Sequence, residues 1–132
     1  MNKKKLHTGA RLLFGLAFFI FGLNGFLEFM PLPPVSEKAG ALLGAFAATG
    51  YFFPMIKVIE ISVGLMLLAN VFAPLALILI TPLLVGITSI HLFLNPEGLP
   101  MMVVLLLLHA FVAYGYKKYH KHVLNTKAVA FS

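Results

Sequence analysis

The stretch 53-FPMIKVIEISVGLMLLANVF-72 decides the fold of this 132-residue chain. It has about the 20 residues that a helix needs to cross the hydrocarbon core of a bilayer. Yet it contains Lys57 and Glu60. An ionised side chain at membrane depth costs at least about 2.5–3.5 kcal/mol, so it rarely faces lipid. Lys57, Glu60 and Gly64 fall on one stripe of a helix, and we expect this stripe to face other helices.

The composition excludes a soluble domain. Hydrophobic residues make up 61% of the chain and charged residues 11%, and there is no Asp. A soluble domain needs more polar surface than this. The chain has no Cys, which excludes disulfides, thiol nucleophiles, Cys-ligated metals and membrane enzymes that relay electrons through a CxxC pair. The net charge of +6 lies at the two ends of the sequence, which indicates membrane topology and no nucleic-acid partner.

Three further apolar segments accompany the first. We expect an all-α integral membrane protein, a four-transmembrane-helix bundle forming a single domain over 1–132. The spans are predicted at about 11–30, 53–72, 74–94 and 99–116. Residues 1–10 are expected to form a basic arm, and Pro82 is expected to kink the third span. The residues after 116 are interpreted as a basic tail.

The segment 36–49 is rich in Ala and Gly and too short to cross a bilayer. Ser36 is a suitable N-cap for it. We expect a short interfacial or re-entrant helix between the first two spans, lying over the mouth of the bundle.

The basic residues predict the orientation. Threading four spans places Lys3, Arg11 and Lys117, with their neighbouring lysines, on one side of the membrane. By the positive-inside rule this side is cytoplasmic, with both termini inside.

Polar side chains concentrate in the outer half of the predicted bundle. At about 1.5 Å per residue, the later spans each bring an ionisable group into this half. We therefore predict a polar ligand-binding pocket there, covered by 36–49. Its candidate residues are Asn24, Lys57, Glu60, Thr88, His91 and His109. Glu60 and His109 are the candidates for catalytic proton exchange, because an intramembrane acid or imidazole is a functional candidate by default.

Each candidate also has a structural interpretation. Lys57 and Glu60, three residues apart, can simply neutralise one another. His109 can be an interhelical hydrogen-bonding residue, and His91 an interfacial one. Haem ligation by both histidines is not expected, because their depths differ by about 7 Å. No ligand spacing supports a tightly bound metal either.

Two motifs resemble a known family. The first span carries Arg11-x3-Gly15-x6-Gly22, and the second carries Glu60-x3-Gly64-Leu65-x-Leu67. This pattern resembles the DoxX and DoxX-like family of small bacterial inner-membrane proteins. The resemblance implies a four-helix bundle and, in several members, association with membrane oxidoreductases or quinone-linked redox chemistry. Asn24 stands where first spans of the family often carry a Lys.

Three functions stay open at this point. The first is an accessory of a membrane redox system that binds a quinone-like cofactor, with electrons supplied by a partner membrane or periplasmic oxidoreductase subunit. The second is a binder or transporter of a small lipophilic solute. The third is a non-catalytic structural subunit, and the sequence leaves enzymatic activity and homo-oligomerisation open.

Overall fold

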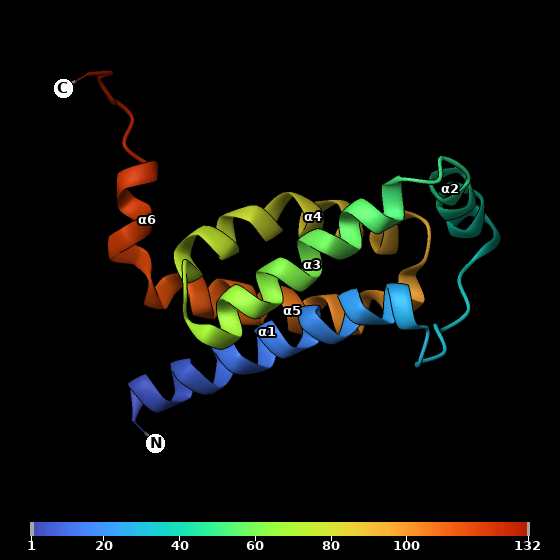
Figure 1. The fold of residues 1–132 in the computed structure, drawn as a ribbon, viewed down its shortest axis with the longest axis horizontal. Helices are drawn as coiled ribbons and strands as arrows, with labels where there is room; N and C mark the ends of the chain where they lie inside the picture. The colour runs from blue at the N-terminus through green and yellow to red at the C-terminus, as the bar shows by residue number, and fades with distance from the viewer. Residues whose placement is uncertain (1, 132) are drawn as a thin grey trace.

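The computed structural model describes residues 2–131 and is all-helical over them (Figure 1). Along the chain the elements are α1 (Lys3–Leu27), α2 (Glu37–Ala48), α3 (Phe52–Ala69), α4 (Ala73–Phe93), the 3-10 turn η1 (Pro96–Gly98), α5 (Leu99–Gly115) and α6 (Lys117–Val123).

Four of these helical segments are long and apolar enough to cross a membrane. They are α1, α3, α4 and the segment Pro96–Gly115 that contains α5. The chain is therefore a multi-pass membrane protein. The first and last described residues lie at the same end of the bundle (Figure 1), here called the terminal end. The opposite end, which carries α2 and η1, is the distal end.

The first helix begins earlier than the sequence predicted. Within the expected basic arm over 1–10, residues 3–10 belong to α1, which begins at Lys3 rather than near residue 11. Asn2 caps its first turn by accepting a hydrogen bond from the Lys4 amide at 2.8 Å. Lysine is a good helix former, so the end of the apolar run does not end the helix. At 25 residues, α1 is about 37 Å long, more than a hydrocarbon core requires.

The terminal basic tail also contains a helix that the sequence analysis did not predict. α6 turns across the terminal end of the bundle instead of continuing α5 (Figure 1). The His120 ring hydrogen-bonds the Pro74 carbonyl at 3.0 Å and so joins α6 to the start of α4. This hydrogen bond to another helix, and not a repeating apolar pattern in the tail, holds α6 in place.

The tightest contact in the bundle is between α1 and α3. A Cβ added at Gly64 would lie 2.6 Å from the Phe19 amide nitrogen of α1. A Cβ added at Gly15 would lie 2.8 Å from Leu67 Cβ. The two backbones therefore approach each other at glycine positions where no other residue fits. We call this contact, with Gly22 included, the glycine seam.

The apolar core lies beside the glycine seam. Fully buried side chains from α1, α3, α4 and α5 meet there, and they include Phe14, Leu67, Leu77, Ile80 and Val112. α4 continues through Pro82. The outer faces of the same helices carry exposed leucine, valine and phenylalanine side chains, as expected for helices that contact lipid.

Candidate functional site

A cleft of about 710 Å³ lies between α3 and α4 in the distal half of the bundle. Its wall from α3 runs from Phe52 to Glu60, and its wall from α4 runs from Leu79 to Ile90. Apart from Lys57, Glu60 and Ser89, the lining side chains are apolar. A volume of this size falls within the range of about 300–1,000 Å³ that is typical of small-molecule sites.

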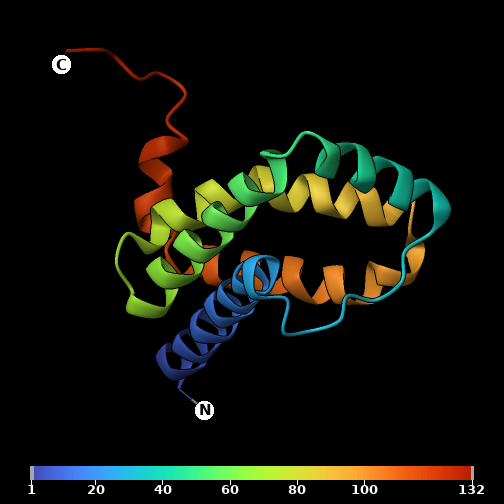
Figure 2. The same ribbon diagram turned by 45° about the vertical axis from the view of Figure 1, so that its right-hand side comes forward.

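The short helix α2 covers this cleft. Leu42, Leu43 and Phe46 line the cleft from α2, which lies beside the distal parts of α3 and α4 (Figure 2). Together with the buried Ala39 they repeat at helical spacing and form one face of the helix. The sequence-based expectation of a helix over the mouth of the bundle agrees with this position. Its depth in a membrane stays a prediction.

Both ends of α2 are attached to the spans. At its start, the Ser36 amide donates to Asn95 Oδ1 at 3.1 Å, and the Ser36 hydroxyl donates to the Leu94 carbonyl at the end of α4. At its other end, the Phe46 ring stacks on the Phe52 ring of α3, with centroids 4.3 Å apart. The helix α2 is therefore attached to α4 at one end and to α3 at the other.

An ion pair forms the polar part of the cleft. Lys57 Nζ lies 3.1 Å from Glu60 Oε2, and the two side chains are 25% and 5% exposed. The Lys57 stem packs on α1, where it fills the space beside Gly25. The pair keeps hydrogen-bonding capacity, because an ammonium has three donors and a carboxylate has two oxygens. The cleft can thus offer both a donor and an acceptor to one polar head group.

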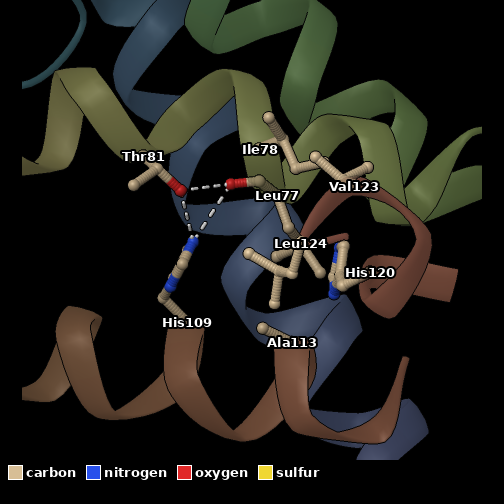
Figure 3. Close-up of a pocket in the computed structure, with 8 residues that line it drawn as sticks. All are labelled: Leu77, Ile78, Thr81, His109, Ala113, His120, Val123 and Leu124. Atoms are coloured by element: carbon tan, nitrogen blue, oxygen red, sulfur yellow. Dashed lines mark hydrogen bonds between the residues drawn. The ribbon is translucent and has the colours of Figure 1, made fainter. Parts of the chain in front are cut away.

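The structure places His109 away from this cleft. It lines a second cavity of about 240 Å³ in the terminal half, between α4, α5 and α6 (Figure 3). Its Nε2 lies 3.1 Å from both the Leu77 carbonyl and Thr81 Oγ1. The Thr81 hydroxyl donates to that carbonyl at 2.6 Å, so its oxygen accepts from the imidazole. His109 joins α5 to α4 and does not share a site with Glu60.

Asn24 and His91 also lie outside the cleft. Asn24 is buried and binds both backbone groups of Met30, accepting from its amide at 2.7 Å and donating to its carbonyl at 3.1 Å. It therefore fixes the turn after α1. The His91 ring lies against Gly98 and 3.4 Å from the Asn95 carbonyl. Its contacts hold the turn between α4 and α5.

Thr88 is placed differently from the other candidates. Its hydroxyl is buried and has no hydrogen-bond partner within residues 2–131, yet Thr88 does not line the cleft. Its neighbours Ile87 and Ser89 do line it. The expected single pocket with six polar residues is therefore reduced to Lys57 and Glu60.

All four motif residues lie where α1 packs on α3; they are Arg11, Gly15, Gly22 and Gly64. The three glycines form the seam between α1 and α3. Arg11, 9% exposed, donates from one guanidinium nitrogen to the Leu67 carbonyl and, at 3.4 Å, to the Leu68 carbonyl. It thereby satisfies carbonyl groups in the last turn of α3, where a cation is also favoured by the helix dipole.

Comparison with known proteins gives no match to a family model, to a curated protein or to a solved structure. Among residues 2–131, no group of three His, Cys, Asp or Glu side chains is placed to hold a metal ion. The choice of a candidate site therefore rests on the geometry of the structure alone. This geometry favours the cleft between α3 and α4.

Sequence reasoning missed most of the cleft's walls. Phe46, Pro82 and Gly86 carry no chemistry that marks them as ligand-binding residues. One signal was available, because Ala39, Leu42, Leu43 and Phe46 follow the spacing of a helix with one buried face. That pattern indicates an inward face for α2 but not which helices it covers.

Proposed function

We propose that this protein binds a small lipophilic molecule with a polar head group, of the quinone-like class, in the cleft between α3 and α4. The observation that supports this is an ion pair at the wall of an otherwise apolar cavity within the spanning segments. The apolar walls suit a hydrocarbon tail or ring. Lys57 and Glu60 suit the polar head.

The quinone-like class follows from the chemistry of the pair. A quinone carbonyl accepts hydrogen bonds, and a hydroquinone hydroxyl donates them. The Lys57 ammonium supplies the donor for the first form, and the Glu60 carboxylate supplies the acceptor for the second. A site with both groups side by side accommodates either redox form. Conversion of a quinone to a hydroquinone takes two electrons and two protons. The electrons would come from a partner oxidoreductase subunit, and Glu60 would transfer the two protons one after the other.

The topology belongs to the same proposal. The terminal end carries Arg11 and most of the lysines, and the carboxylates of Glu28, Glu37 and Glu97 lie at the distal end. By the positive-inside rule, the terminal end is cytoplasmic and the cleft lies in the outer half of a bacterial inner membrane. Membership of the DoxX-like family stays a prediction that rests on the two sequence motifs.

The test is to purify the protein from membranes, extract any bound lipophilic molecules and identify them by mass spectrometry. Binding of a short-tailed quinone is then titrated by thermal shift in detergent. We expect Glu60→Gln to weaken binding about 10- to 100-fold, since a hydrogen bond to a charged group contributes about 1.5–3 kcal/mol. Glu97→Gln, an exposed distal carboxylate outside the cleft, is the matched control and should bind as the parent does.

Two outcomes would contradict the proposal. One is unchanged quinone binding by the Glu60→Gln protein. The other combines three results. Glu60→Gln fails to fold, and adding Lys57→Met restores folding. In addition, neither the restored protein nor the parent retains a lipophilic molecule. The second outcome favours the structural-subunit function, in which the pair only neutralises its own charges.

A further inference from the structure

The second cavity, which the proposed function does not use, presents a hydrocarbon-like surface. Its lining comes from α4, α5 and α6 (Figure 3). One ring nitrogen of each histidine at its wall is engaged, with His109 Nε2 on the Leu77 carbonyl and His120 Nε2 on the Pro74 carbonyl. The remaining lining is aliphatic, including Ile78, Ala113 and Leu124. A cavity of this kind in a membrane protein fits an alkyl chain better than a polar solute.

The helix α6 joins this cavity to a pair of lysines. His120, Val123 and Leu124 line the cavity from α6. At 100° per residue, Lys117 and Lys121 follow directly beside this face. Both lysines are exposed. Lys117 Nζ donates to the Tyr114 hydroxyl at 3.3 Å and lies 4.5 Å from the centre of that ring, which leaves the rest of its ammonium for another partner.

Within residues 2–131, the terminal end has no acidic side chain to neutralise these lysines. The four acidic side chains of the sequence are Glu28, Glu37, Glu60 and Glu97. Three of them lie at the distal end and the fourth lies in the cleft. The terminal end thus carries positive charge beside an apolar cavity. The matching partner has an anionic head and a hydrocarbon chain, and the bilayer that surrounds the helices supplies such molecules.

We propose that α6 and the cavity behind it bind one anionic phospholipid. An acyl chain lies in the cavity between α4 and α5, and the phosphate contacts Lys117 and Lys121. This site is separate from the cleft at Lys57 and Glu60 and does not depend on its function. A basic residue near an anionic membrane surface strengthens binding about fivefold, so two lysines account for a preference of more than tenfold over a neutral lipid.

The experiment uses the full chain in detergent and measures lipid binding by native mass spectrometry. Phosphatidylglycerol and phosphatidylcholine with identical acyl chains are titrated separately. We expect the parent to bind phosphatidylglycerol more tightly by at least about tenfold. K117Q/K121Q should remove this preference, and should weaken phosphatidylglycerol binding more than phosphatidylcholine binding, because the choline ammonium already neutralises the phosphate of the neutral lipid. K4Q/K5Q, which removes two exposed lysines from the same end of the bundle, is the matched control and should keep the preference.

The cavity is tested by a second pair of variants. Ala113→Leu places a larger side chain in the cavity and should weaken binding of both lipids. Ala110→Leu adds the same volume at an exposed position of α5 outside the cavity and should have no effect. Glu60→Gln should not affect lipid binding, which separates this site from the quinone-like site.

Several results would overturn the proposal. Equal losses in K117Q/K121Q and K4Q/K5Q would indicate diffuse surface charge in place of a site. Competition by inorganic phosphate as strong as that by phosphatidylglycerol would indicate a head-group site without an acyl chain. The absence of any preference in the parent protein would exclude the lysines as phosphate ligands. Because Lys117 and Lys121 are exposed, their variants are expected to fold even if Ala113→Leu does not.

Discussion

The two sides of α3 differ in how closely they pack against their neighbours. On the side of α1, glycines allow the two backbones to approach closely. On the side of α4, the distal halves of the helices separate and leave about 710 Å³. One helix thus has a rigid side and an open side. A rigid attachment on one side lets the other side carry a cleft without loss of the fold.

Filling the glycine seam should have the largest effect on stability. Gly64→Leu forces the α1 and α3 backbones apart, because even a Cβ at this position would lie 2.6 Å from the Phe19 amide. We expect a loss of about 3 kcal/mol or more of stability. The loss is measured by denaturant titration followed by circular dichroism. Gly9→Leu, on the same helix as the partner surface and with nothing within 4 Å of its added Cβ, should remain folded.

Removal of the guanidinium at the end of the seam should have the next largest effect. Arg11→Met removes the guanidinium donor from the Leu67 and Leu68 carbonyls in the last turn of α3, and only the Leu67 carbonyl keeps a second donor, the Asn70 amide at 3.3 Å. The expected loss is about 1–3 kcal/mol, in line with a buried polar group that loses its partner. Arg11→Lys should recover part of it, since an ammonium restores a donor without the fork of the guanidinium. Equal stability of the methionine variant and the parent would show that water satisfies these carbonyls.

The same kind of substitution on the open side should cost little stability. Gly86 lines the cleft, and nothing lies within 4 Å of an added Cβ. Gly86→Leu should change stability by less than about 1 kcal/mol, because it adds a better helix former to α4. It should also reduce quinone binding, because the leucine occupies the cleft. If Gly86→Leu were as damaging as Gly64→Leu, the contrast between the two sides of α3 would be wrong.

A similarly small effect on stability is expected where α5 meets the end of α3. The Tyr116 hydroxyl donates to Asn70 Oδ1 at 2.7 Å, and burial raises the pKa of Tyr116. Tyr116→Phe should cost about 0.5–1.5 kcal/mol near neutral pH. The raised pKa favours the neutral phenol in the folded protein. The advantage of the parent is therefore present below the ordinary tyrosine pKa of about 10 and is lost as the pH rises through the raised value.

The measurement is thermal unfolding of the parent and the Tyr116→Phe variant at pH 7 and above pH 10. Comparing the two proteins at each pH removes the effect of the lysines, which titrate in both. A difference in stability that does not shrink at high pH would contradict the assigned role of the phenol.

The sequence predicted the number of spans because hydropathy and helix length are properties of single segments. It misplaced the start of α1, since Lys3–Lys5 end the apolar run but do not end a helix. It missed α6, whose attachment depends on His120 reaching the Pro74 carbonyl of another helix. No local pattern in the tail contains that information.

The candidate site was predicted in part, and for a similar reason. The cost of burying a charge correctly indicated that Lys57 and Glu60 face the interior of the bundle. The estimated depths of the residues in the membrane then led to the prediction that His109 shares their pocket. Depth alone, however, does not show which pair of helices a side chain lies between. The order of the helices around the bundle places His109 between α4 and α5, away from the gap between α3 and α4.

The attachment of α2 at both ends has a mechanical consequence for the gap that it spans. One end follows the distal tip of α4 through Ser36, and the other follows α3 through Phe46. The 12 residues between them form a stiff rod about 18 Å long. Because it is attached at both ends, α2 sets the distance between the distal ends of α3 and α4. A ligand that is wider than this spacing can enter the cleft only after the contacts at one end of α2 have broken.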